Sequence, residues 1–262
     1  MSDWIHNLPV PWMALVVFGF TFLLAAATLA IVSALANEQR AKSFKAISPG
    51  MLPVLGIIFG LFVAFTAAQV WADSDRAGAA VSREASALRA VTLLAAGLPA
   101  EQEARLLALV RSYVEQAATV EWPMMARQTA TLRVAPAALA EALQMVVAMT
   151  PQGAGQQTAQ REIITELGSA LDARRQRIIV SHAEVNPVKW WCLYLQALCE
   201  LFVIALVHCD NRLTSAVALG LFAAGVAASV LLIAAHDRPF TGQIFIGPEP
   251  LLQIMPGESA KP

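Results

Sequence analysis

Glu200 is a carboxylate within an otherwise apolar run of the chain, Trp190–Val207, and Gln196 lies one helical turn before it. Ionisable side chains are costly inside a membrane span and usually mark a pore, a proton relay or a buried pair. On a helix, residues four apart share one face. Gln196 and Glu200 are therefore candidates for a polar pathway. The alternative is a protonated Glu200 that is hydrogen-bonded to a neighbouring helix.

A second pattern consists of small residues. Gly56, Gly60 and Ala64 recur every four residues in the apolar run Met51–Ala72. Small residues at this spacing let two helices approach closely in lipid. The pattern predicts tight helix packing through this face, with a second copy of the chain as the partner.

A third pattern lies on the same run. Pro53, Ile57 and Leu61 share one stripe at helical spacing, which Ala64 and Ala68 continue. A ring of such side chains from several subunits would form an apolar neck, and a narrow apolar ring controls ion flow by expelling water. Any spanning helix has an apolar stripe, so the spacing alone also fits ordinary packing.

No other group of residues has the spacing of a catalytic or metal centre. The chain has no nucleophile elbow, P-loop, HExxH or dinucleotide-binding glycine motif, and its three cysteines form no CxxC or Cys/His pattern. We therefore expect neither an enzyme nor a bound metal or cofactor. Arg174, Arg175 and Arg177 form the one dense basic cluster, which we interpret as a solvated, positive face beside the membrane.

Four apolar runs must position these residues. A bilayer span needs about 20 mainly apolar residues, and it must be helical because lipid offers no partners to the backbone. The runs are Val10–Ala36, Met51–Ala72, Trp190–Val207 and Leu213–Ala235. The sequence therefore predicts an integral membrane protein with four transmembrane helices.

The composition agrees with this interpretation. Hydrophobic residues make up 57% of the chain and charged residues 14%, whereas soluble domains carry roughly 25% charged residues. The net charge of -1 argues against a nucleic-acid partner, since binding phosphates needs a basic surface.

Residues 73–186 form a polar insert whose apolar positions recur at helical spacing. Helix breaks are predicted at 97–99, 122–123, 134–136 and 150–153. No breaker follows the second run, so we expect one continuous helix from about Pro53 to about Gly97. The predicted fold is all-α, with a helical-bundle insert between the second and third spans. Its segments are a first transmembrane pair (1–72), the insert (73–186), a second pair (187–235) and a tail (236–262) that packs on the bundle.

Several segments together resemble a known family, the bacterial bestrophin-like membrane proteins. The resemblance follows nearly the whole chain in order and rests on these segments: Gly60–Phe65 with Val70-Trp71, Ala80–Ala85, Glu121–Pro123, Asn186–Trp191, Asp237–Phe240 and Pro248–Pro250. It implies a bacterial inner-membrane protein that spans the bilayer several times.

A weaker resemblance is to bestrophins themselves, which are pentameric anion channels. Their second membrane helix carries an apolar neck that starts near a proline, and this implies a neck at Pro53, Ile57 and Leu61. Two features differ: these positions are less aromatic than in animal bestrophins, and the acidic tail cluster that binds calcium there is missing. Calcium gating is therefore not implied.

From these patterns and resemblances we expect a homo-oligomeric ion channel in the lipid bilayer that conducts inorganic anions. The alternatives are a membrane-bound sensor whose helical insert binds a ligand, and a non-conducting membrane scaffold. The basic residues do not agree on the topology. Arg40, Lys42 and Lys45 favour a cytoplasmic first loop, whereas Arg76, Arg83 and the Arg174–Arg177 cluster favour a cytoplasmic insert. The likeness to bestrophins favours a cytoplasmic insert.

Overall fold

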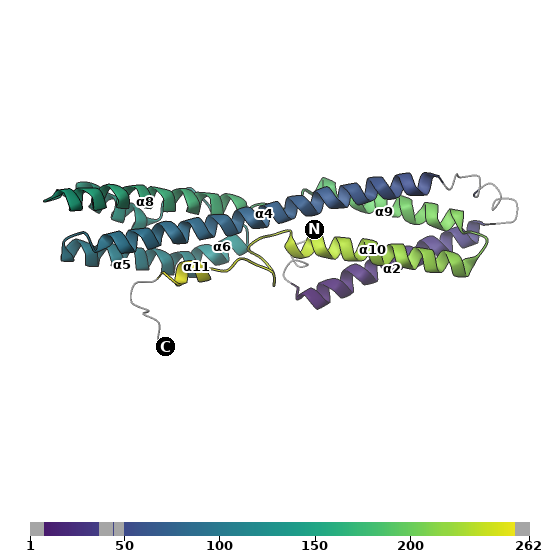
Figure 1. Cartoon of the computed structure of the whole chain (residues 1–262). Coiled ribbons are helices and arrows are strands. Elements are labelled where there is room, and N and C mark those ends of the chain that lie inside the picture. The colour runs from purple at the N-terminus through teal and green to yellow at the C-terminus, as the bar shows by residue number, and fades with distance from the viewer. Residues whose placement is uncertain (1–7, 37–43, 45–49, 255–262) are drawn as a thin grey trace, which may run out of the picture. The chain divides into compact units, whose positions relative to one another are not determined.

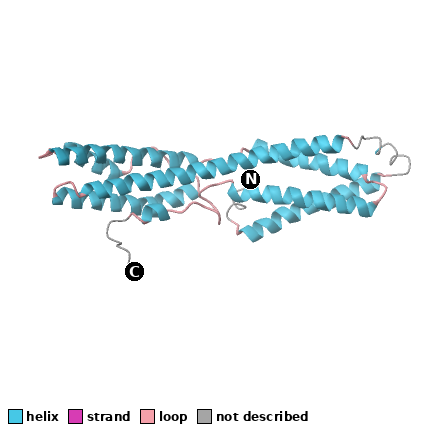
Figure 2. Cartoon of the chain, in the orientation of Figure 1, coloured by secondary structure: helices cyan, strands magenta, loops and turns pink. Residues whose placement is uncertain are grey.

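The structure is a computed structural model that describes residues 8–36, 44 and 50–254. Every regular element within these ranges is a helix, as Figure 2 shows. Arg40, Lys42 and Lys45, which entered the topology argument, lie outside the described residues. The chain divides into two compact units. The membrane unit comprises Met1–Ala72, Glu184–Asp237 and Gly242–Ile244, and the insert unit comprises Asp73–Ala183, Arg238–Thr241 and Phe245–Pro262.

Figure 1 labels most of the helices in chain order. Their bounds are α2 Val10–Leu35, α4 Met51–Ala95, α5 Ala100–Gln116, the π-helix η1 Ala117–Glu121, α6 Trp122–Ala126, α7 Ala137–Ala148, α8 Ala154–Val180, α9 Pro187–Val207, α10 Arg212–His236 and α11 Glu249–Leu252.

Four of these helices, α2, α4, α9 and α10, are long and apolar enough to cross a membrane. The bounds of α2, α9 and α10 match three of the predicted spans to within a few residues, and α4 begins where the second predicted span begins and continues beyond it. The third span begins at Pro187, three residues earlier than predicted, because Asn186 caps it: its Oδ1 accepts a hydrogen bond from the Val188 amide at 2.9 Å. Asn211 caps α10 in the same way, with Oδ1 accepting from Leu213 N at 3.1 Å.

Helix α4 is a single helix of 45 residues that continues from the membrane unit into the insert unit. No proline occurs between Pro53 and Pro99, and Gly97-Leu98 ends the helix before Pro99. The predicted continuous helix is confirmed.

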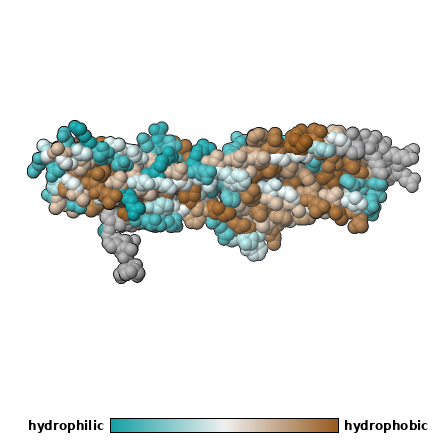
Figure 3. All heavy atoms as spheres, in the orientation of Figure 1, coloured by the Kyte–Doolittle hydropathy of each residue, from teal (hydrophilic) through white to brown (hydrophobic). Residues whose placement is uncertain are grey.

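In the membrane unit, α10 packs along α2, and α9 packs against both. Apolar side chains fill the contacts, among them Val17, Leu193 and Val230. Several threonines inside the spans satisfy their hydroxyls locally: the Thr66 hydroxyl donates to the Phe62 carbonyl one turn earlier, at 2.8 Å. Hydrophobic residues cover most of this unit in the face shown in Figure 3.

In the insert unit, α7 packs against both α5 and α8 around a core that includes Leu88, Val110 and Leu167. The chain after α10 contributes to this core, as predicted for the tail. Leu251 on α11 is fully buried, and the Phe240 ring meets Trp122 edge-on at 6.0 Å between centroids.

The predicted helix break at Trp122-Pro123 is wrong. The helical path continues from α5 through η1 into α6, and the Trp122 amide donates to the Ala117 carbonyl five residues earlier. A proline inside a regular helix removes a hydrogen bond and clashes with the carbonyl four residues back. The wider π turn directly before Pro123 accommodates the ring without ending the helix.

Candidate pore-lining face and buried charge cluster

The predicted neck residues form an exposed stripe on the membrane half of α4. Pro53 is exposed, and the exposed fractions of Ile57 and Leu61 are 67% and 57%. Phe59, between them in sequence, is instead buried and packs on Phe222 of α10 with ring centroids 5.7 Å apart. One face of α4 thus holds the helix to its own unit, while the neck stripe is free to meet lipid, water or another subunit.

The three small residues do not share one environment. Gly56 lies over α9, where an added Cβ would come within 3.2 Å of Glu200 Oε1. At Gly60 an added Cβ would meet nothing within 4 Å, and Ala64 is exposed. The close approach at Gly56 is therefore within the chain, and only Gly60 and Ala64 remain available to another subunit.

Glu200 is buried in the membrane unit, with an exposed fraction of 3%. Within the part of the chain that the structure describes, its Oε2 has no hydrogen-bond partner, and neither does Oε1 of the half-buried Gln196. A buried carboxyl oxygen without a partner has lost its hydration without compensation. Because Glu200 faces Gly56 on α4, its carboxyl group lies one helix away from the neck stripe.

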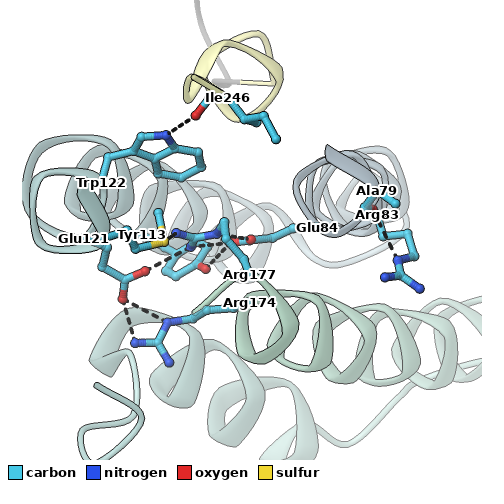
Figure 4. Close-up of polar contacts among 10 residues, drawn as sticks. Ala79, Arg83, Glu84, Tyr113, Glu121, Trp122, Arg174, Arg177 and Ile246 are labelled. Atoms are coloured by element: carbon cyan, nitrogen blue, oxygen red, sulfur yellow. Dashed lines mark hydrogen bonds and ion pairs between the residues drawn. The ribbon is translucent and has the colours of Figure 1, made fainter. Parts of the chain in front are cut away.

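The insert unit contains a buried charge cluster that joins α4, α5, η1 and α8 (Figure 4). Arg177 of α8 and Glu84 of α4 are both fully buried and form a bidentate pair, Nε to Oε2 at 2.7 Å and Nη2 to Oε1 at 3.0 Å. The hydroxyl of Tyr113 on α5 donates to Glu84 Oε1. Bidentate, charge-assisted contacts of this kind are strong and geometrically specific.

The π-helix supplies the second carboxylate of the cluster. Glu121, the last residue of η1, accepts from Arg177 Nη2 at 2.9 Å and from Arg174 Nε and Nη2 at 2.9 and 2.6 Å. Two carboxylates and two guanidinium groups thus balance in charge. The π turn is where the helical ladder widens, and it delivers Glu121 to both arginines.

An aromatic ring closes the cluster on one side. The Arg177 guanidinium lies 4.4 Å from the centre of the Trp122 ring, a cation–π contact. The Trp122 indole donates to the Ile246 carbonyl at 2.9 Å, so the tail of the insert unit holds this ring in place, as Figure 4 shows.

This environment shifts two acid–base equilibria. Burial raises the pKa of the Tyr113 phenol well above its ordinary value, and the neighbouring Glu84 carboxylate raises it further. Burial alone lowers the pKa of Arg177, but the charge of Glu84 and its hydrogen bonds more than offset that effect and raise the pKa above the ordinary arginine value. Tyr113 stays protonated and Arg177 stays charged at neutral pH.

The interpretation of the basic cluster as a solvated face is wrong for two of its three residues. Arg174 and Arg177 have exposed fractions of 7% and 0%, and only Arg175 is exposed. They are buried because Glu84 and Glu121 neutralise them, and these partners lie 93 and 56 residues from Arg177 in the sequence. In the described ranges, no group of His, Cys, Asp or Glu side chains could hold a metal ion.

Comparison with known proteins identifies the family to which this chain belongs. The model of the bestrophin-like domain matches residues 19–251. The chain belongs to the bestrophin-like family. A crystallised point variant of a bacterial bestrophin homologue from Klebsiella pneumoniae is 13% identical with a TM-score of 0.69, and the match covers 91% of this chain and 96% of that one. Another structure, described as a membrane protein, is 14% identical with a TM-score of 0.68, covering 91% and 98%. No curated protein matches the sequence.

Sequence reasoning did not identify the buried charge cluster of this bestrophin-like chain. Glu84 and Glu121 fall within two segments on which the family resemblance rested, but no periodicity or spacing pairs them with arginines of α8. The available signal was the position of Glu84 within the buried stripe of α4, beside Ala80, Val81 and Leu88. A charged residue on an apolar stripe requires a partner.

Proposed function

We propose that this bestrophin-like chain is a subunit of a homo-oligomeric channel that conducts inorganic anions passively through the membrane. Its neck is the stripe of Pro53, Ile57 and Leu61 on α4. The observation that carries the proposal is that this stripe is exposed in the single chain. Several copies of α4 arranged around an axis would turn it into an apolar ring that resists ions by dewetting. The likeness to bestrophins implies a pentamer.

The decisive measurement is ion current from the purified protein in a planar bilayer. Ile57→Ala combined with Leu61→Ala widens the ring and lets water enter, so leak current should rise several-fold. The matched control is Val217→Ala with Leu221→Ala, a pair at the same spacing on α10 with exposed fractions of 55% and 72%. Equal currents from both variants, or a pore not lined by Ile57 and Leu61, would contradict the neck.

Phe59→Ala provides the opposite contrast. Because Phe59 is buried against Phe222, truncating its ring should cost about 3–5 kcal/mol of folding stability. Protein that still folds should conduct with the selectivity of the wild type, as expected for a residue outside the neck.

Assembly through the Gly60 and Ala64 face can be tested separately. A leucine at Gly60 meets no atom of its own chain near its Cβ, so Gly60→Leu should fold normally and weaken contacts between subunits. Gly19→Leu on α2 is the control, since an added Cβ there also meets nothing within 4 Å. Native mass spectrometry in detergent measures the subunit number, and an unchanged oligomer for Gly60→Leu would exclude this face as the contact.

Cation conduction is a second candidate because of Glu200. A buried carboxylate one helix behind the neck repels anions and attracts cations if it is ionised. The reversal potential under a potassium chloride gradient separates the two: its sign gives the preferred ion directly.

The sensor and scaffold alternatives predict no current at all. We place the insert in the cytoplasm of a bacterial cell, with the chain in the inner membrane. A reporter fused at Ala135, which lies in the exposed loop between α6 and α7, tests this placement. A sensor that binds an external ligand needs this loop outside the cell.

A further inference from the structure

A groove between α2 and α9 lies in the membrane unit, away from the neck stripe. Its volume is about 580 Å³, within the usual range for small-molecule sites, roughly 300–1,000 Å³. Its lining is almost entirely apolar and comes from both helices, including Val16, Phe20 and Leu24 of α2 and Trp190, Leu195 and Leu198 of α9. Both helices are long and apolar enough to span the bilayer.

One buried polar atom of the lining has no partner. The Trp190 side chain is 4% exposed, and its indole Nε1 has no hydrogen-bond acceptor among the described residues. The Thr21 hydroxyl, also in the lining, is satisfied, because it donates to the Val17 carbonyl at 2.8 Å. The buried indole N–H of Trp190 therefore lacks an acceptor, and the groove that Trp190 helps to line is otherwise apolar.

The groove also has the length of one lipid leaflet. Its lining on α9 runs from Pro187 to Leu198, which is about 16 Å at the helical rise. This is about half of the roughly 30 Å of bilayer hydrocarbon. Trp190 lies in the first turn of α9, where an indole meets the headgroup level, and Leu198 lies deeper in the span.

We propose that this groove binds one acyl chain of a membrane phospholipid, whose ester carbonyl accepts the hydrogen bond of Trp190 Nε1. A water-soluble ligand would lose its hydration in this lining without gaining partners, whereas an acyl chain requires none. The proposal depends on the membrane placement of α2 and α9 and not on ion conduction.

The test uses the full chain in vesicles of phosphatidylethanolamine and phosphatidylglycerol with a tracer phospholipid that carries a photoreactive group in its acyl chain. Peptide mapping after irradiation should find labels on residues 16–24 and 190–198. A diether tracer lacks the carbonyl acceptor, so the diester should label the groove roughly fivefold more strongly, the worth of one neutral hydrogen bond.

Two variants separate the hydrogen bond from the groove. Trp190→Phe keeps the ring beside Tyr194, which now lies 6.1 Å away between centroids, and should abolish the preference for the diester while groove labelling persists. Leu195→Trp fills the groove rim and should lower labelling several-fold. Leu221→Trp is its control, since Leu221 is an exposed leucine on α10 outside the groove.

Equal labelling by diester and diether in the wild type would overturn the role of Trp190. Labels spread evenly over all lipid-facing helices, or absent from the groove because a second copy of the chain covers it, would overturn the site itself. If Leu195→Trp does not fold, the comparison of diester with diether in the wild type and in Trp190→Phe still decides the proposal.

Discussion

Glu84 and Glu200 are both buried carboxylates, and the two units treat them in opposite ways. In the insert unit, the Glu84 carboxylate accepts hydrogen bonds from Nε and Nη2 of Arg177 and from the Tyr113 hydroxyl. In the membrane unit, Oε2 of Glu200 has no partner in the described part of the chain. Burying a charge is costly unless it is paired and hydrogen-bonded. Glu84 is thus fully paired within its unit, whereas the described residues of the membrane unit leave Oε2 of Glu200 without a partner.

The two sites also differ in how they are built. The buried charge cluster draws its members from α4, α5, η1 and α8, so it forms only when all of these helices are in place. Glu200 and Gln196 come from one turn of α9, and Gly56 on α4 makes room for the carboxylate. The first arrangement specifies a fold, and the second leaves two buried acceptor oxygens of α9 without partners among the described residues.

The largest effect on stability is expected from breaking the ion pair between Glu84 and Arg177. Arg177→Met leaves the Glu84 carboxylate buried without its cation, and removing one partner of a buried ion pair costs about 3–5 kcal/mol. Thermal unfolding in detergent should show a marked loss of stability, whereas Arg175→Met, at the exposed position nearby, should melt like the wild type.

A double variant tests whether that loss comes from the stranded charge. Glu84→Leu with Arg177→Met removes both members of the pair and should recover much of the stability that Arg177→Met loses. An Arg177→Met protein with wild-type stability would show that the cluster is not a stabilising feature, whatever its geometry.

Local patterns predicted most of the fold. The four spans and the continuous α4 follow from apolar runs and from the absence of proline between Pro53 and Pro99, all of which act within one stretch of chain. The burial of Glu200 followed from its place in an apolar run. The buried charge cluster was not predicted because its pairing is non-local. In the sequence Arg177 is one of three neighbouring arginines, and its partner Glu84 lies 93 residues away.

The π turn was missed for a related reason. Trp122-Pro123 is a breaker by every local rule, since proline offers no amide to the helix. The structure keeps the helix and widens it instead, because the same turn brings Glu121 to two arginines and Trp122 to Arg177. The spacing of neighbouring residues does not predict tertiary contacts of this kind.

A smaller effect is expected on the pH dependence of stability, through Tyr113 in the insert unit. Burial raises the pKa of Tyr113, so below about pH 10 the folded and unfolded states both hold the proton and the stabilisation is complete. Above that pH the unfolded state loses the proton while the native state keeps it, and stability falls as the pH rises toward the raised pKa. Tyr113→Phe should cost about 1.5–3 kcal/mol at pH 8, the worth of a hydrogen bond to a charged acceptor.

The measurement is the difference in thermal stability between wild type and Tyr113→Phe from pH 8 to pH 11. The difference should shrink with rising pH, because only the wild type carries the phenol. Melting curves that fall in parallel for the two proteins would mean that other groups cause the alkaline loss.

The smallest effect on stability, and the clearest on function, is expected at the unpaired site. Glu200→Gln replaces the carboxyl group, whose Oε2 has no partner among the described residues, with an amide of similar size. It should change stability by less than about 1 kcal/mol, or at most a few degrees in melting temperature. Glu84→Gln, the same change at the ion pair with Arg177, should destabilise far more because Arg177 loses its bidentate partner.

If Glu200 lies beside the ion path, Glu200→Gln should also alter the current or its dependence on pH. Wild-type currents from this variant at every pH would assign Glu200 a packing role beside Gly56, and a large loss of stability would show that a partner of its carboxylate comes from another subunit.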